Sequence, residues 1–312
     1  MRAKGKRLAG KIYRRPRVGL ALSGGGARGL AHIGVLKVLE REGIPVDCLA
    51  GTSMGGVVAA AYAAGVSPET LEQEALALSQ VRQLVRLADP APGQGGLLEG
   101  KRVQDYFERL LNGATFADLS HPLALVAVDL HSGQEVILQE GSVAAAIRAT
   151  ISLPGLFVPV NQGEARLVDG GVLNNLPVDV ARDLGGEVII AVDVTARTQE
   201  ATFWQTVGKH RFVPGVLIQW VEVFSEALEV MMEALQERKL AEVQPDLLLR
   251  PAIPAEVSIL SGFGRARDVI AAGEAAAEAA LPQLRELVQP RWMVPDPLRS
   301  LRMGVGKRSA RH

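Results

Sequence analysis

The chain has 312 residues and no net charge, and 48% of its residues are hydrophobic but only 4% aromatic. This composition favours a layered α/β protein with a core of Ala, Val, Leu and Ile over a sandwich rich in Tyr and Trp. The single cysteine, Cys48, excludes an internal disulfide framework and a cysteine metal cluster, and it fits a reducing compartment.

The charges gather at the two ends of the chain. Residues 1–17 carry eight Lys or Arg and no acid, and residues 291–312 carry six against one Asp, which leaves an acidic body between two basic tails. The tails are either solvated ends or segments attracted to anionic lipid surfaces, where each basic residue contributes about 1 kcal/mol. Few aromatic residues lie between these charges, so nucleic acid is the weaker expectation.

No secretory signal is visible, because the basic N-terminus runs into Pro16 and a core strand without a separate apolar region. The uncharged stretch 48–68 is long enough to span a bilayer, but its four glycines and Pro68 make it a poor candidate. We therefore expect a cytoplasmic protein that can contact membranes peripherally.

Two strand-loop-helix units open the predicted domain. The first is a strand over residues 17–23, a glycine loop over 24–29 and a helix over 30–42. The second is a strand over 46–50, which runs directly into the loop at Ser53 and a helix-like run over 57–64. Consecutive units of this kind predict parallel strands joined by right-handed crossovers.

The later elements alternate in the same way. The expected order is helices over 67–87 and 100–111, a hairpin of strands over 123–130 and 135–138, a helix over 142–150, strands over 157–160 and 166–168, a helix over 177–184 and a strand over 188–194. A helix over 216–239 follows, with an apolar stripe that comprises Leu217, Trp220, Val221, Phe224, Leu228, Met231 and Leu235. That stripe indicates either packing on the body or a lid or membrane-facing helix. An edge strand over 247–249 and a helix over 265–287, broken at Pro282, complete the chain.

The pentapeptide Gly51-Thr52-Ser53-Met54-Gly55 fits the Gly-x-Ser-x-Gly pattern of a nucleophile elbow. In such a turn a serine is exposed at the end of a strand, and the glycines leave room for the strained backbone. The strand before it and the helix after it are the context that this motif requires. Ser53 is therefore the candidate nucleophile.

The glycine loop Gly24-Gly25-Gly26-Ala27-Arg28-Gly29 has two possible uses. Its Gly-x-Gly-x-x-Gly spacing fits a dinucleotide site, but such a site needs an acidic residue at the end of the second strand, whereas Asp47 lies at its beginning. The loop better fits an oxyanion hole made of backbone N–H groups. Arg28 either adds a fixed positive charge or caps and solvates the helix.

A serine nucleophile needs a base, and no histidine is placed as a triad requires. Of the five histidines only His210 and His312 follow Asp169, and both lie among basic residues without strand-end context. Asp169, in Asp169-Gly170-Gly171, is the alternative base. A free Asp is weaker than a free His by about 2.6 pKa units, but desolvation raises a carboxylate's pKa by a comparable amount, so a Ser-Asp dyad is energetically feasible.

The glycine loop, the elbow and the Asp169-Gly170-Gly171 turn, in this order, resemble the patatin-like phospholipase family in its short bacterial form. Supporting segments are residues 20–23, 32–36, 152–157 and 174–177, and the resemblance covers roughly residues 18–182. It implies a three-layer α/β/α fold with a mainly parallel central sheet. It also implies a metal-free Ser53–Asp169 dyad, an oxyanion hole in residues 24–29 and hydrolysis of lipid acyl esters.

On this basis the chain divides into a basic tail (1–17), a patatin-like catalytic domain (18–195), a helical C-terminal extension packed on it (196–290) and a second basic tail (291–312). We expect a lipid ester as substrate, without cofactor or metal. A non-catalytic lipid-binding or regulatory protein on the same fold, and a dinucleotide-binding enzyme, are the alternatives.

Overall fold

The computed structural model describes residues 6–8, 11–79, 87–91, 93, 95–195, 215–259 and 261–293. The outer parts of both basic tails, the first part of the C-terminal extension with His210, and the end of the helix expected over 67–87 lie outside the described residues.

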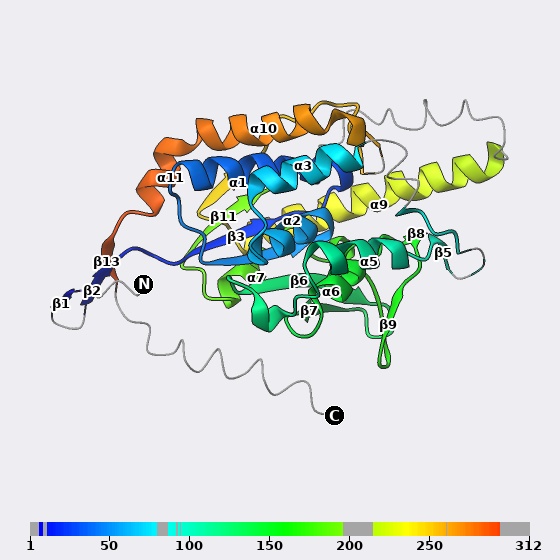
Figure 1. Cartoon of the computed structure of the whole chain (residues 1–312), viewed down its shortest axis with the longest axis horizontal. Helices are drawn as coiled ribbons and strands as arrows, with labels where there is room; N and C mark the ends of the chain where they lie inside the picture. The colour runs from blue at the N-terminus through cyan, green and yellow to red at the C-terminus, as the bar shows by residue number, and fades with distance from the viewer. Residues whose placement is uncertain are drawn as a thin grey trace.

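The centre of the molecule is an eight-stranded sheet (Figure 1). Its order is β12 (Leu247–Leu249), β11 (Val188–Val192), β3 (Val18–Leu22), β4 (Cys48–Thr52), β6 (Leu123–Asp129), β10 (Ala165–Asp169) and β9 (Val160–Gln162), with β7 (Gln134–Leu138) also paired to β6. The first five strands are parallel, whereas β7, β10 and β9 run antiparallel to their neighbours. The predicted mainly parallel sheet is therefore confirmed.

Helices cover both faces of this sheet. One layer comprises α1 (Ala31–Arg41), α2 (Ser53–Ala63), α3 (Pro68–Leu78), α5 (Lys101–Leu110), α6 (Val143–Thr150), α10 (Ala266–Ala279) and α11 (Leu281–Leu287). The other comprises α7 (Val178–Asp183) and the C-terminal part of α9 (Gly215–Glu242). In Figure 1, α1, α3 and α10 lie side by side above the sheet and α7 lies below it.

The two faces of the sheet have different side chains. Because side chains alternate along a strand, Leu20, Leu49 and Ile190 point into the larger helical layer. Ala21 and Ala50 point to the other face, where their small size lets α7 pack closely. The expected three-layer α/β/α fold with a helical C-terminal region is thus confirmed.

Two helices can be compared in detail with the sequence prediction. The last one is interrupted at Ala280 and resumes as α11 with Pro282 in its first turn, as the proline predicts. In α9 the packing interpretation of the predicted apolar stripe is wrong for Phe224 and Met231, which are half exposed or more, while Met232 and Gln236 are buried. The side chains of Leu217, Trp220 and Val221 lie outside the described part of the structure, and the lid or membrane-facing interpretation stays a prediction. Residues four apart share one helix face, so Met232 and Gln236 form the side of α9 that contacts the body.

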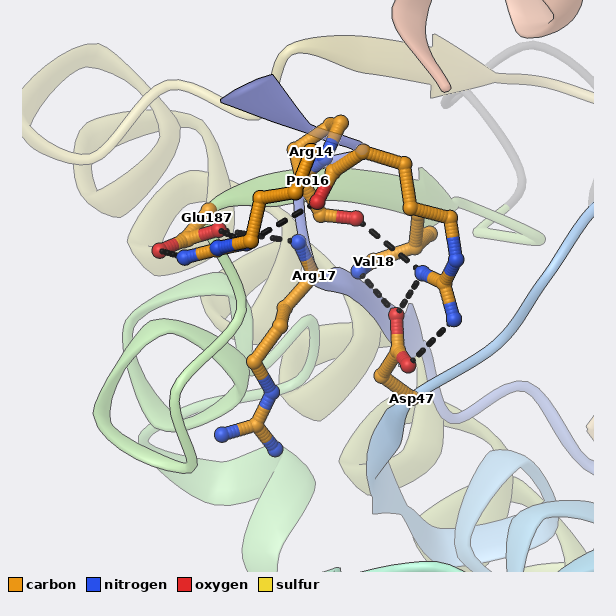
Figure 2. A network of polar contacts seen from close by, with 7 residues as sticks. Arg14, Pro16, Arg17, Val18, Asp47 and Glu187 are labelled. Atoms are coloured by element: carbon orange, nitrogen blue, oxygen red, sulfur yellow. Dashed lines mark hydrogen bonds and ion pairs between the residues drawn. The ribbon is translucent and has the colours of Figure 1, made fainter. Parts of the chain in front are cut away.

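The N-terminal basic segment is tied to the body through Arg14 and Arg15, and its first part pairs with the C-terminal end of the described chain. β1 (Lys6–Leu8), β2 (Lys11–Arg14) and β13 (Arg291–Met293) form a small antiparallel sheet, which the sequence analysis did not predict. Beyond it, Arg14 pairs with Glu187 at 2.7 Å and Arg15 with Asp47 at 2.6 Å (Figure 2). Since β2 leads into the amino end of β3, these ion pairs lie at the opposite end of the parallel strands from Ser53.

The remaining short elements are β5 (Gly96–Leu98), which pairs with β8 (Gly155–Phe157), and four 3-10 turns. The turns are η1 (Gly26–Leu30), η2 (Phe116–Asp118), η3 (Gly170–Val172) and η4 (Phe263–Arg265). Within the described ranges, no helix combines the length and the apolar character needed to cross a bilayer.

Candidate active site

Ser53 lies at a strained turn between β4 and α2. Its φ is +52°, in the left-handed region that a residue with a side chain rarely adopts. Helix α2 begins at Ser53 itself, four residues before the helix-like run in the sequence. A Cβ on Gly51 would lie 2.6 Å from the Cα of Gly56, and one on Gly55 would overlap the Leu22 carbonyl oxygen, so both glycines are required for this close packing.

Hydrogen bonds from neighbouring elements fix the same turn. The Ser53 N–H donates to Thr150 Oγ1 at 3.0 Å, and the Thr52 hydroxyl donates to the Asn174 carbonyl oxygen at 2.8 Å. Thr150 in turn donates to the carbonyl oxygen of Val126 on β6. The turn is therefore tied to the sheet, to α6 and to the segment after η3.

Strand β6 brings Asp169 next to the serine. It pairs with β4 through Val126 and Thr52, and with β10 through Ala127 and Asp169, so the ends of β4 and β10 meet along one strand. Asp169 is 1% exposed. Its Oδ1 accepts the Gly171 N–H at 2.8 Å, and the Ser53 side chain is near enough to its carboxylate to lower the carboxyl pKa.

Burial raises the pKa of the Asp169 carboxyl to about 6. The Gly171 N–H and the Ser53 side chain act in the opposite direction, because they stabilise the ionised form, but they offset only part of the effect of burial. A carboxylate of raised pKa is a stronger base than an exposed one.

The glycine loop lies against Ser53. A Cβ on Gly24 would be 3.0 Å from the Ser53 Cβ. The Gly24 N–H donates to the Asn175 carbonyl oxygen, and the Arg28 N–H donates to the Gly25 carbonyl oxygen, each at 3.1 Å. Within the described residues, no acceptor pairs with the N–H groups of Gly25, Gly26 and Ala27. The N–H groups without a partner are therefore a subset of the predicted loop, and the oxyanion hole stays a prediction.

Two other members of the predicted site pack beside these residues. A Cβ on Gly29 would meet the side chain of Met54 at 2.5 Å, so Gly29 permits the first turn of α2 to approach η1. Gly170 lies directly against β6, because a Cβ there would be 2.6 Å from the backbone carbon of Val126. Gly29 and Gly170 thus act by close packing.

The Arg28 side chain contacts the C-terminal region. It is 6% exposed, its Nε donates to the Val257 carbonyl oxygen at 3.0 Å, and its Nη2 lies 3.5 Å from Glu229 on α9. The expectation that it is solvated is wrong. Arg28 links the glycine loop to the C-terminal region, which neither sequence interpretation anticipated.

The geometry argues against the alternative sites. Asp47 accepts hydrogen bonds from Arg15 and from the Val18 N–H at the amino end of β4, so it cannot hold a ribose at the other end (Figure 2). His32 is buried, hydrogen-bonds through Nε2 to the Ser23 carbonyl oxygen, and has a pKa lowered by burial to about 4. Across the described ranges there is no group of three or more His, Cys, Asp or Glu that could hold a metal ion.

Four residues that the sequence analysis gave no role also contact this site: Thr150, Asn175, Met232 and Gln236. Asn175 is 2% exposed, and its Oδ1 has no hydrogen-bond partner in the described part of the chain. Asn175 lies within a segment that carries the family resemblance, residues 174–177, so a signal was present for it, whereas Thr150 lies just before the segment 152–157. Met232 and Gln236 lie outside those segments.

Comparisons with known proteins agree with these features. The family model described as patatin-like phospholipase matches residues 20–182, just over half of the chain. An uncharacterized NTE family protein of Mycobacterium tuberculosis is 32% identical over 91% of this chain and 49% of its own length. Patatin-like phospholipase domain-containing protein 6 of Mus musculus is 35% identical over 61% of this chain and 14% of its own length. The chain thus spans about half the length, or less, of these curated relatives.

Solved structures with a similar arrangement include VipD from Legionella pneumophila and the type III effector protein ExoU. Both have a TM-score of 0.47, at 13% and 14% identity, and they cover 97% and 95% of this chain and 73% and 60% of their own. The assignment of this chain to a family does not rest on these solved structures. It rests on the family model and on the topology around Ser53 and Asp169. The chain belongs to the patatin-like phospholipase family.

Proposed function

We propose that this protein is a serine acyl hydrolase that cleaves fatty-acyl esters of phospholipids, lysophospholipids or related lipids through an acyl-Ser53 intermediate. The observation that carries the proposal is the position of Ser53, on its strained turn, beside the buried carboxylate of Asp169, whose pKa its side chain influences. Membership of a family described as phospholipases supports the substrate class.

In the first half of the reaction, Ser53 Oγ attacks the ester carbonyl carbon. Its proton passes to the Asp169 carboxylate as the new C–O bond forms. The carbonyl oxygen becomes an oxyanion, for which the unpaired N–H groups of Gly25, Gly26 and Ala27 are the available donors. The tetrahedral intermediate then collapses, and Asp169 returns the proton to the leaving alcohol.

In the second half, water repeats the same steps on the acyl-enzyme. Asp169 takes a proton from water, the resulting oxyanion uses the same N–H groups, and Ser53 leaves with the proton that Asp169 returns. One carboxylate therefore acts as base and then as acid in each half, so no histidine is required.

The raised pKa of Asp169 makes its carboxylate a stronger base, which matters because the proposed mechanism has no histidine. A rise from 3.8 to about 6 corresponds to about 3 kcal/mol of added basicity. Each well-placed oxyanion donor typically contributes a rate factor of about 10²–10³. Together these effects compensate for the absence of a histidine base.

We also propose that the protein works at the surface of membranes, where its substrates lie. The basic termini supply a general attraction to anionic lipid, although Arg14 and Arg15 are already paired with acids of the body. Binding to vesicles that contain an anionic phospholipid should weaken when residues 1–10 are deleted and when salt is raised. Binding that is unchanged by both would remove this role of the termini.

The direct test of the function is release of fatty acid from phospholipid vesicles by purified protein. Ser53→Ala should reduce release to background, and Ser79→Ala, at the end of α3, should leave it unchanged. Equal rates for the unmutated protein and Ser53→Ala would refute the proposal. A folded wild-type protein that releases no fatty acid would favour a lipid-binding role without catalysis.

A further inference from the structure

Helix α9 packs against η3, the turn that follows Asp169, although it lies outside the part of the chain that the family model matches. Gly171 shows the contact. The methyl group of Met232 lies against the position that a Cβ on Gly171 would take. From that same position, Asp169 Oδ1 is 3.2 Å and Asn175 Oδ1 is 3.0 Å away. The Met232 side chain, 6% exposed, and Asp169 Oδ1 are therefore both next to Gly171, so Met232 helps to bury the segment that carries the carboxylate.

One turn further along α9, Gln236 binds Asn175. Asn175 Nδ2 donates to Gln236 Oε1 at 2.8 Å, and Gln236 Nε2 donates to Thr195 Oγ1 at 3.0 Å. The Thr195 hydroxyl donates to the Asp193 carboxylate, which also accepts from Arg250 Nε at 2.9 Å. These contacts form one chain of hydrogen bonds from the active site to an ion pair.

The Asp193 carboxylate, at the end of this series of hydrogen bonds, determines which group is the donor and which the acceptor in each bond. An ionised carboxylate only accepts, so the single hydroxyl proton of Thr195 is used on Asp193, the closer acceptor, rather than on Gln236 Oε1 at 3.1 Å. Thr195 Oγ1 must then accept from the Gln236 amide nitrogen, and this directs Gln236 Oε1 to the amide nitrogen of Asn175. Asn175 consequently presents its carbonyl oxygen, rather than its amide group, to Gly24 and Gly171 beside the dyad.

We propose that α9 completes the active site, with Met232 shielding the Asp169 carboxylate from water and Gln236 holding the Asn175 carbonyl oxygen toward the Ser53–Asp169 pair. This inference rests on the proposed hydrolase function. Both α9 residues are positioning residues, because Met232 acts through Asp169 and Gln236 acts through Asn175.

The charged groups around Asp169 are occupied elsewhere. On α9, Glu229 pairs with Arg28, while Glu233 is partly exposed. On α6, Arg148 donates to Ser152 and to the carbonyl oxygens of Glu99 and Val158. No charged group contributes to the raised pKa of Asp169, which burial dominates. Removing an apolar group that buries this carboxylate should therefore lower its pKa.

The test is the rate at which a fluorophosphonate probe labels Ser53, measured as a function of pH. The wild-type rate should rise with a midpoint near pH 6, the pKa of Asp169. Met232→Ala admits water and should move the midpoint down by about one pH unit. Met232→Gln, of similar length but polar, should move it in the same direction if the alanine variant does not fold.

Two variants serve as controls for the covering role. Met232→Leu keeps an apolar side chain of similar volume and should restore the wild-type midpoint. Met231→Ala changes the adjacent methionine, which is 61% exposed, and should leave the whole profile unchanged. An unmoved midpoint in both Met232→Ala and Met232→Gln, in folded protein, would overturn the proposal for Met232.

Gln236→Met tests the second contact, because it removes both hydrogen bonds of Gln236 at similar volume. We expect the labelling rate at high pH to fall about tenfold, the equivalent of one lost hydrogen bond, while the midpoint stays near pH 6. An unchanged rate would overturn the role of Gln236. Wild-type protein that is not labelled on Ser53 would refute the hydrolase function itself, so the two failures are distinguishable.

Discussion

Asp169→Asn should make the protein inactive and, at neutral pH, more stable than the wild type. The native pKa of about 6 lies above the usual 3.8, so between these values the native protein holds a proton that the unfolded chain has released. The contribution of Asp169 to the free energy of unfolding therefore falls as pH rises from about 4 through 6. Above that range the buried carboxylate costs up to about 3 kcal/mol.

Asparagine cannot ionise, yet its Oδ1 can still accept the Gly171 N–H that Asp169 accepts at 2.8 Å. Urea unfolding at pH 4 and at pH 8 measures the effect. The stability of Asp169→Asn relative to the wild type should increase by about 3 kcal/mol between the two values. A relative stability that stays constant, or falls, would contradict a desolvated carboxylate at this position.

Asp47 (Figure 2) serves as a control, because the pKa of its carboxyl is shifted in the opposite direction from that of Asp169. Burial acts to raise its pKa, but the hydrogen bonds from Arg15 and the Val18 N–H outweigh it, and the net pKa is lowered. The stabilisation by Asp47 is present above the unfolded pKa and is lost as pH falls through the native one. Asp47→Asn should therefore destabilise the protein at pH 8 and have less effect in acid.

Three further predictions follow from the site. Ser53→Gly and Ser53→Ala should both be inactive. The glycine variant should be the more stable of the two by about 1 kcal/mol in thermal unfolding, because φ is +52° at this position. Equal stability of the two variants would argue against backbone strain. Gly24→Ala should lose most activity, because its Cβ would meet Asn175 Oδ1 and Ser53, while Gly264→Ala, with open space around it, should retain full activity. Ester hydrolysis should increase with pH through a midpoint near 6 as Asp169 ionises, and a midpoint near 4 would show that the carboxylate is solvated in the working enzyme.

The parallel part of the fold and the elements that carry Ser53 and Asp169 were predictable from sequence. Glycine patterns and apolar runs are local signals, and they predicted the strands that end at Leu22 and Thr52 and the turn at Asp169. The proximity of Ser53 to Asp169 is not local, because it depends on β6 pairing with both β4 and β10. In the sequence it could be inferred only from the family resemblance.

The contribution of α9 was not predictable in the same way. Its sequence offers apolar residues on more than one face, and Phe224 and Met231 of the regular stripe are exposed. The body selects the face with Met232 and Gln236, since Asn175 needs a polar partner and Gly171 leaves space for a methyl group. The ion pairs of Arg14 and Arg15 were missed for a similar reason, because Glu187 and Asp47 are distant in sequence.

The most direct test of the proposed hydrolase is to map the residue that a fluorophosphonate probe labels, in the wild type and in Asp169→Asn, by mass spectrometry of the digested protein. We expect the label on Ser53 in the wild type, and a loss of labelling in Asp169→Asn although Ser53 is still present. Label on another serine, or equal labelling of Ser53 in both proteins, would contradict an active site in which Asp169 activates Ser53.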